Sequence, residues 1–442
     1  MTLSATTAKA ALLGRRDAVS GLLIFVTLLL ALLDTFGLAD LATPATLCAW
    51  AFVALEFGRL SAKQRLPIYL LLGIGCGFIA WAWSSGARID PLAILGEHLK
   101  LAMLLAAVNF IRLSTRLEQV NDRPGPRSFV TTLGGMHLLS SVANFSSMLL
   151  VGEQLKRRDT LSSLSRIILG RGFSLAVLWS PFLSILPLVL EQVPGTELYS
   201  ILPFTLGLAL FGLGYTLLEV RYRYPRDLAR YPGYPMTART LMMPLCLIAA
   251  ILAVSGVWPT LPTVGVVALL SLLTPLMLLT LQQGPVQASR RLVEHTLTRL
   301  ADTRGEISLF LSAGFLAAGV KACIAAGLFS LPFAHTDAQV AIFVMWSIVI
   351  LASLGIHQFA LVATYAGLLA DVTTAPTLMA IAYIIATSVS MSGSLFSGVN
   401  FILQARFNCT GRAILRNNLA YSLIMLVAAS LLIYMMQLSG IH

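Results

Sequence analysis

The chain is a succession of apolar runs, each about long enough to cross a bilayer, separated by short polar stretches. The hydrocarbon core of a membrane is ~30 Å thick, so a helix needs about 20 apolar residues to cross it. Of the 442 residues, 57% are hydrophobic and only 11% are charged, whereas soluble domains carry roughly a quarter charged residues. No polar stretch is long enough to form a domain outside the membrane. The pattern predicts an all-α polytopic membrane protein and excludes a soluble enzyme, a disordered chain and a nucleic-acid-binding module.

Hydropathy predicts about eleven full transmembrane helices and two segments of another kind. The expected full spans are residues 18–37, 41–57, 67–84, 92–113, 162–190, 199–220, 237–256, 260–281, 306–330, 377–403 and 413–436. The other two segments, 129–151 and 338–370, hold glycine and polar residues in their middle. Arg15 and Arg16 precede the first run, which we interpret as a retained span and not as a cleaved signal peptide.

The net charge of +11 comes from basic residues concentrated in alternate loops. The intervening loops 35–42, 191–198 and 331–337 contain no lysine or arginine. Cytoplasmic loops of membrane proteins carry an excess of positive charge. We therefore expect a multi-pass protein of the inner (plasma) membrane with its N-terminus in the cytoplasm.

The two unusual segments are predicted to be re-entrant hairpins. Residues 129–155 have basic residues on both sides, so this segment is expected to enter from the cytoplasm and return there. Residues 338–370 have no basic flank, so this segment is expected to enter from outside. Polar, glycine-containing backbone is tolerated at membrane depth where it lines a cavity or is buried in protein. The two hairpins are therefore expected to be opposed.

A short internal repeat accompanies the hairpins. Residues 135–143 and 355–363 share Gly, His, Val and Ala at the same spacing, and residues 178–182 resemble 395–399 in the same order. Opposite entry sides together with a repeat imply inverted topology. Transporters of that kind place their solute site near the middle of the membrane, at discontinuous helices.

This pattern resembles the ion transporter superfamily, which includes the divalent-anion/sodium symporters and the arsenite permeases. The Ser-, Gly- and Asn-rich stretch 388–400 is similar to the break in the second half of those proteins, although the Ser-Asn-Thr triplet of the symporter hairpin tips is missing here. The resemblance implies a homodimer that works by an elevator motion, in which a scaffold holds still while hairpins and broken helices carry the solute. The implied parts are a scaffold of residues 1–113, scaffold helices with a cytoplasmic linker at 237–304, a first transport repeat at 127–220 (hairpin 129–155, broken helix 162–190) and a second at 305–442 (hairpin 338–370, broken helix 377–403).

Polar side chains near the hairpin tips and the breaks are the candidate site. Small polar residues also serve helix packing, but serines at alternate positions face different sides of a helix and so favour an unwound segment lining a site. The residues expected to bind substrate are Ser140, Ser141, Asn144, Ser180, Ser353, Ser394, Ser397 and Asn400.

Four charged or titratable residues lie within the predicted membrane segments, and three of them have two interpretations each. His137 and His357, at matching places in the repeat, either bond a nearby carbonyl or carry a coupling proton. Arg171 is expected to reach the cytoplasmic surface, with a role as anion partner as the second interpretation. Lys321 lies within a span without an identifiable partner, although a charge there needs one.

The predicted function is secondary active transport of a small organic anion, a carboxylate, in symport with H⁺ or Na⁺. The hairpin tips hold no carboxylate to neutralise a cation, whereas helix N-termini and hydroxyl or amide donors can hold an anion. An arsenite-like neutral-solute permease and a lipid or polymer-precursor flippase or exporter are the alternatives. The chain has none of the HExxH, GxSxG or Walker A motifs and no metal-type cysteine spacing, so no enzyme, catalytic residue, metal or cofactor is expected. The expected partners are the solute and membrane lipids, and not nucleic acid.

Overall fold

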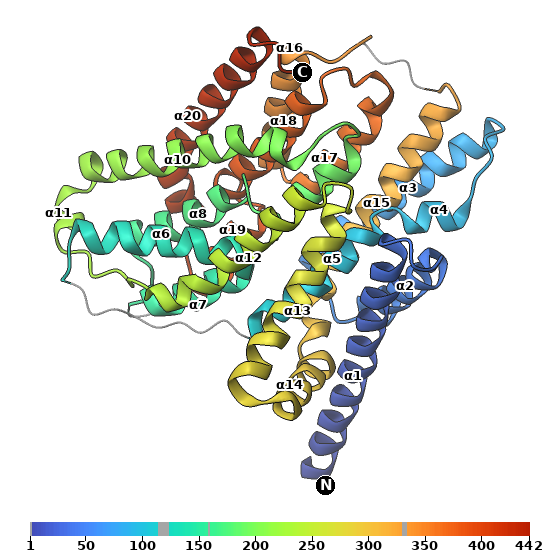
Figure 1. Cartoon of the computed structure of the whole chain (residues 1–442), viewed down its shortest axis with the longest axis horizontal. Helices are drawn as coiled ribbons and strands as arrows, with labels where there is room; N and C mark the ends of the chain where they lie inside the picture. The colour runs from blue at the N-terminus through green and yellow to red at the C-terminus, as the bar shows by residue number, and fades with distance from the viewer. Residues whose placement is uncertain (1, 114–122, 158–159, 329–333) are drawn as a thin grey trace. The chain divides into compact units, whose positions relative to one another are not determined.

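The computed structural model describes residues 2–113, 123–157, 160–328 and 334–442. These residues form helices, turns and loops, apart from one isolated bridge between Arg157 and Thr160. They divide into two compact units, whose members can be followed in Figure 1. Unit 1 spans Met1–Ser114 and Ala249–Phe329, and unit 2 spans Thr115–Ile248 and Ser330–His442.

Nine helical stretches of the described chain are long and apolar enough to cross a membrane, with lengths from 18 to 32 residues. The predicted class is therefore confirmed: this is an all-α, multi-pass membrane protein. The stretch expected as the second span is a helix of only 16 residues, Ala42–Phe57, shorter than the ~20 residues that a typical crossing takes.

Unit 1 contains the N-terminal helices and those that follow the first half of unit 2. Its elements are α1 (Thr2–Thr35), α2 (Ala42–Phe57), α3 (Ala62–Ser84), α4 (Pro91–Gly96), α5 (Leu99–Asn109), η1 (Phe110–Leu113), the second half of α12 (Ala238–Val257), α13 (Thr263–Gln283), α14 (Pro285–Thr298), η2 (Leu300–Thr303) and α15 (Arg304–Ala325). Helix α15 packs along α3, and α1 packs against α2. This division differs from the sequence expectation at two points. The expected second transport repeat began at residue 305 and so included α15, and the expected scaffold segment 237–304 included the first half of α12, which belongs to unit 2.

Ion pairs join distant elements of unit 1. The buried Glu56 of α2 accepts from Arg304 at the start of α15 (2.6 Å) and from Ser20 of α1 (2.7 Å). Lys321 of α15 donates to Glu97, in the break between α4 and α5 (2.7 Å). Glu97 is therefore the partner of Lys321 that sequence reasoning could not identify.

Unit 2 contains both hairpin segments and both broken helices. Its elements are α6 (Pro126–Ala143), α7 (Phe145–Leu155), α8 (Ser163–Ala176), α9 (Ile185–Gln192), α10 (Leu198–Arg223), α11 (Pro225–Ala229), the first half of α12, α16 (Ala338–Ser353), α17 (Gln358–Leu369), η3 (Ala370–Val372), α18 (Pro376–Gly393), α19 (Gly398–Phe407) and α20 (Gly411–Leu438).

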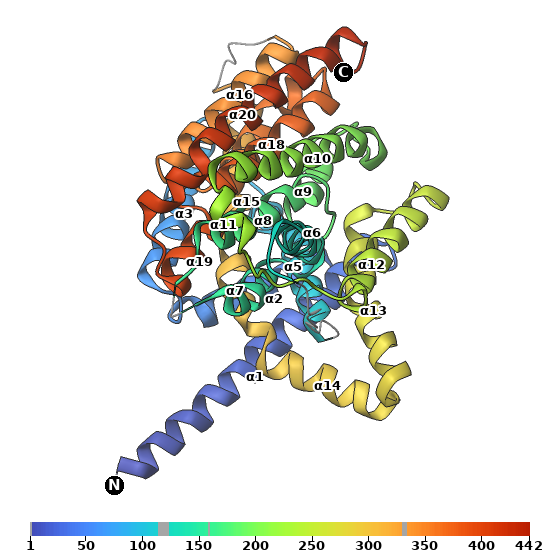
Figure 2. The same ribbon diagram turned by 90° about the vertical axis from the view of Figure 1, so that its left-hand side faces the viewer.

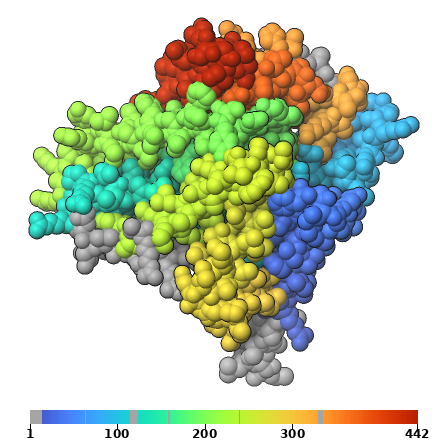
Figure 3. Space-filling view, in the orientation of Figure 1, coloured from blue at the N-terminus to red at the C-terminus, as the bar shows by residue number. Residues whose placement is uncertain are grey.

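The broken helix α18–α19 lies in the core of unit 2, and α10 lies on its surface. In the most apolar window of Pro376–Phe407, 89% of the residues are buried, against 33% for α10. Helix α18 packs against α16, α20 and α10, as Figure 2 shows. Figure 3 shows α10 (green) along the surface, where Leu210 and Leu218 are exposed. Exposed leucines in one band are what a lipid-facing helix presents.

The first hairpin segment folds back on itself at Asn144. Helix α6 ends and α7 begins there, and Asn144 takes a positive φ of 50°. Both ends of the segment lie beside Tyr231, because the Gly125 amide donates to the Tyr231 carbonyl (2.8 Å) and Gln154 lines one cavity with Tyr231. Helix α8 also starts there, since the Ser165 and Tyr231 hydroxyls are 3.0 Å apart. Helices α6 and α7 therefore run in opposite directions.

The second hairpin segment folds back at residues 354–357, between α16 and α17. Thr336, before α16, and Thr374, after α17, are joined by three hydrogen bonds of 2.8 to 3.2 Å. The two ends of this segment therefore also lie together.

The two broken helices run in opposite directions through unit 2. Helix α9 ends at Gln192, and Thr196, four residues later, donates to the carbonyl of Pro376, the first residue of α18 (3.3 Å). Helix α19 ends at Phe407, whose ring packs on Gly152 near the base of the first hairpin, where α8 starts. The bases of the two hairpins therefore lie at opposite ends of unit 2.

Candidate functional site

Each hairpin tip is hydrogen-bonded to the break of the broken helix that follows it. Ser180 Oγ donates to the carbonyl of Ser141, and Ser394 Oγ donates to the carbonyl of Ala352 (2.7 Å). Each of these two serines also accepts from the backbone amide two residues later, at 3.2 Å in both cases. Ser180 and Ser394 are thus equivalent in the two halves, and the match of Ser180 with Ser397 in the sequence is wrong by three residues. The hydroxyl proton of each serine is therefore used in a hydrogen bond to the backbone of a hairpin tip.

Helices α7 and α19 lie side by side and run in the same direction. The ring of Phe145, the first residue of α7, lies against Gly398, the first residue of α19, where a Cβ would be 2.9 Å from the ring. At the other end, Arg406 Nε of α19 donates to Glu153 of α7 (2.8 Å). The N-terminal ends of these two half-helices therefore meet at the tip of the first hairpin.

Helices α9 and α17 form the corresponding pair. They pack together, and both end at the base of the second hairpin, where Thr196 bonds Pro376 and Thr374 bonds Thr336. Their N-terminal ends therefore point into unit 2 from the opposite side. The first N–H groups of a helix have no partner within the helix and carry partial positive charge. Four half-helices, α7, α9, α17 and α19, thus present positive ends to the interior of unit 2.

Two hydrogen-bond donors at the start of α7 are free to bind a solute. The Ser146 hydroxyl is buried, with 7% of the residue exposed, and has no hydrogen-bond partner in the described part of the chain. Asn144 caps α7 by accepting from the Phe145 amide (2.8 Å), which leaves its Nδ2 without a bond to any described residue. Sequence reasoning identified Asn144 but not Ser146. The signal for Ser146 was its position in the first turn of the helix after the break.

Asn400 and Ser397 stabilise the break between α18 and α19. Asn400 Nδ2 lies 2.9 to 3.3 Å from the carbonyls of Met391, Ser392 and Ser394. The Ser397 hydroxyl donates to the Met391 carbonyl (2.8 Å) and accepts from the Asn400 amide (3.2 Å). Asn400 Oδ1 is buried and has no partner among the residues described. Asn400 therefore offers an acceptor, which suits a cation and not the anion expected there.

The remaining expected serines donate to carbonyls of their own helices. The donor distances are 2.6 Å from Ser140, 2.7 Å from Ser141 and 2.8 Å from Ser353. Ser140 Oγ also lies 3.0 Å from Ser147 Oγ in the other arm of the hairpin. Ser140 and Ser141 are buried, whereas Ser353 is exposed. With their protons engaged, these hydroxyls offer a solute only acceptor lone pairs.

The two histidines occupy different places in their hairpins, so their predicted equivalence is wrong. His137 lies in the middle of α6, with Nδ1 3.2 Å from the Gly172 carbonyl and Nε2 accepting from Trp179 Nε1 (3.0 Å). A ring that donates through one nitrogen and accepts through the other is neutral. His357 instead caps α17, where Nδ1 accepts from a backbone amide at 3.3 Å. By position, Asn144 is the equivalent of His357, because both cap the second arm.

Arg171 does not reach the surface, which corrects the preferred sequence interpretation. Its side chain is fully buried and donates to Glu219 (2.6 Å), to Asn418 (3.2 Å) and to the carbonyl of Asn417. Its guanidinium also lies 4.1 Å from the ring centroid of Tyr421. Since Glu219 already neutralises it, Arg171 joins α8 to α10 and α20.

The fold and these contacts define the class as a polytopic membrane protein with a core of two hairpins and two broken helices. Among the described residues, no group of three or more His, Cys, Asp or Glu side chains could hold a metal ion. No protein-family model and no curated protein sequence matches the chain.

Proposed function

We propose that this chain is a secondary active transporter that moves a small organic anion, a carboxylate, across the inner membrane. The observation that carries the proposal is the convergence of four half-helix N-termini in the interior of unit 2. Membrane transporters with inverted repeats use such ends of discontinuous helices to bind solute near the middle of the membrane. In this proposal the two hairpins are re-entrant from opposite faces and form an inverted repeat, as in the ion transporter superfamily that the sequence resembles.

An anionic solute is supported by the charges around the breaks. Each helix N-terminus contributes roughly 0.3–2 kcal/mol toward an anion, so several must converge to hold one. Asn144 Nδ2 and the Ser146 hydroxyl add two donors. The carboxylates of the hairpins and broken helices that the structure describes lie at the hairpin bases and not at the breaks: Glu153, Glu191, Asp337 and Asp371. A cation would therefore lack a counter-charge at the breaks.

Transport is proposed to be a symport with Na⁺ or H⁺. The unpartnered Asn400 Oδ1 is the kind of oxygen ligand that a hard cation such as Na⁺ takes. His357 is the candidate proton carrier, because within the described residues only its Nδ1 is hydrogen-bonded. His137 is less suited to carry a proton, since protonating Nε2 would break its bond from Trp179.

The proposed mechanism is an elevator in which unit 2 carries the solute and unit 1 is the scaffold. The division of the chain into two compact units, with both hairpins and both broken helices in unit 2, supports it. A homodimer follows from the resemblance, and a cytoplasmic N-terminus follows from the basic loops.

The test is uptake into liposomes that contain the purified protein. Labelled monocarboxylates and dicarboxylates, arsenite and an organic cation are offered in turn, under a Na⁺ gradient or a proton gradient. We expect saturable, gradient-driven uptake of a carboxylate, a raised KM in Asn144→Ala, and wild-type kinetics in Thr131→Ala, whose exposed hydroxyl bonds only its own helix. Uptake of the cation or arsenite alone would overturn the anion assignment. Movement of labelled lipid between leaflets without solute uptake would favour a flippase.

A further inference from the structure

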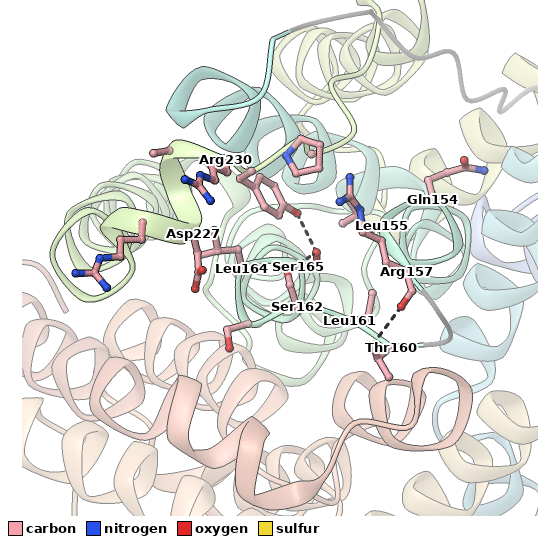
Figure 4. Close-up of a pocket in the computed structure, with 16 residues that line it drawn as sticks. Gln154, Leu155, Arg157, Thr160, Leu161, Ser162, Leu164, Ser165, Asp227 and Arg230 are labelled. Atoms are coloured by element: carbon pink, nitrogen blue, oxygen red, sulfur yellow. Dashed lines mark hydrogen bonds between the residues drawn. The ribbon is translucent and has the colours of Figure 1, made fainter.

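A cavity of unit 2 lies at the base of the first hairpin. It has a volume of about 650 Å³ and lies between the start of α8 and the segment around α11 (Figure 4). One wall contains residues 154, 155, 157 and 160–165, and the other contains residues 226, 227 and 229–233. The cavity thus joins the end of the first hairpin to the connection that leads from α10 into α12.

The lining of this cavity is strongly basic. Arg157, Arg226 and Arg230 line it, against a single carboxylate of the described lining, Asp227. Within the described structure none of the three guanidinium groups has an ion-pair or hydrogen-bond partner. Figure 4 shows Arg157 and Arg230 on opposite walls of the cavity. Arginines without partners on facing walls leave their donors available to one shared ligand.

The floor of the cavity supplies further donors. Helix α8, 14 residues long, begins there, and Ser162 caps it by accepting from the Ser165 amide (3.1 Å). Tyr231 is 5% exposed, and its hydroxyl lies 3.0 Å from Ser165 Oγ. Burial raises the pKa of Tyr231 to about 12, so the phenol keeps its proton at neutral pH. The floor therefore combines a helix N-terminus with neutral hydroxyl groups.

We propose that this cavity binds a phosphate group, carried by a lipid headgroup or by a soluble phosphate compound. The guanidinium fork matches the geometry of phosphate oxygens, and arginines from two walls can bind one phosphate together. A helix N-terminus is a recurrent phosphate-binding element. A bound phosphate would tie the base of the first hairpin to the α11 segment. This inference does not depend on the proposed transport activity.

The experiment measures phosphate binding to the purified full-length protein in detergent. Inorganic phosphate is titrated by calorimetry, and native mass spectrometry compares retention of phosphatidylglycerol with that of phosphatidylcholine. The test variant is Arg157→Gln with Arg230→Gln. The control variant, Arg221→Gln with Arg412→Gln, removes the same charge from two exposed arginines outside the cavity lining.

We expect the cavity variant to lose about tenfold or more in affinity and the control to stay within about twofold of wild type. Binding of phosphate alone assigns a soluble ligand, and retention of phosphatidylglycerol alone assigns a lipid. The proposal is overturned if neither binds, or if both variants lose affinity equally, because the effect would then be general surface charge. Because the substituted arginines are exposed, all variants should keep the wild-type melting temperature.

Discussion

Replacing Ser146 with alanine should change the stability of the protein and its affinity for solute in opposite directions. Ser146 Oγ is buried at the start of α7 and is unpaired within the described chain. Burying a hydroxyl without a partner costs about 1–3 kcal/mol. The cap of α7 is Asn144, which the substitution leaves in place. Ser146→Ala should therefore raise the free energy of unfolding of the solute-free protein by about 1 kcal/mol.

The same substitution should weaken solute binding. A hydrogen bond to a charged group contributes about 1.5–3 kcal/mol. Its loss corresponds to an increase of about ten- to a hundredfold in Kd. A gain in stability together with a loss of affinity is the signature of a polar group held unpaired for a ligand.

Thermal unfolding with and without saturating solute, together with KM in liposomes, measures both effects. Ser147→Ala is the matched control, because the Ser147 hydroxyl donates to the Asn144 carbonyl (2.6 Å) and lies 3.0 Å from Ser140 Oγ. That variant should lose stability. If Ser146→Ala is destabilised like Ser147→Ala and keeps the wild-type KM, the Ser146 hydroxyl has an internal partner and our assignment of it to the solute is wrong.

Three further predictions concern the fold. Glu219→Leu leaves the buried Arg171 without its carboxylate and should lower the free energy of unfolding by about 3–5 kcal/mol. The control Glu153→Gln, at an exposed pair, should lower it by less than about 1 kcal/mol. Equal losses in denaturant titrations would show that the Arg171–Glu219 ion pair does not stabilise the fold in this way. Burial, with the charges of Arg112 and Arg299, lowers the pKa of His295 from 6.5 to about 4 in the folded protein. The unfolded protein therefore binds a proton at this histidine more readily than the folded protein does. Stability should fall by on the order of 3 kcal/mol as the pH drops from 6.5 toward 4, and a His295→Gln variant that kept the same slope would exclude this histidine as the cause. Single cysteines introduced at Arg127 and Arg157, in a chain without native cysteines, should both react with an impermeant reagent from the same side of the membrane. Single cysteines at Thr336 and Thr374 should both react from the opposite side. If the two members of either pair react from different sides, the re-entrant hairpins are refuted.

Most of the helices and the places where they are interrupted could be predicted from the sequence, because hydropathy and helix-breaking residues act locally. The first hairpin turns at Asn144, within a stretch that contains glycine and polar residues instead of a continuous apolar run. The break between α18 and α19 falls within the Ser- and Gly-rich stretch 388–400. The hairpin at 338–370 was predicted from its length, its flanks without basic residues, and the glycine and polar residues in its middle. Unbonded backbone in a membrane requires polar or buried surroundings, so such breaks leave a compositional signature.

The candidate site could be predicted only in part. Asn144 was identified correctly as a residue of the break, but a serine pattern cannot show which hydroxyls are already hydrogen-bonded. Ser180 and Ser394 turned out to hold the hairpin tips, and Asn400 uses its donors on carbonyls of its own break. Ser146, the buried hydroxyl without a partner in the described structure, was passed over.

The sequence by itself determined the class of the protein, the positions of most of its helices and the breaks in the two hairpins and in residues 377–403, since each depends on the apolar content of some twenty neighbouring residues. The break between α4 and α5, within the expected span 92–113, was not predicted. Only the tertiary structure decided the partners of the polar groups. Arg171 meets Glu219, 48 residues away on another helix, and Lys321 meets Glu97, 224 residues away. Which donor remains free for a solute depends on such pairings, because a buried polar group binds whichever partner the packing of distant helices brings within about 3 Å.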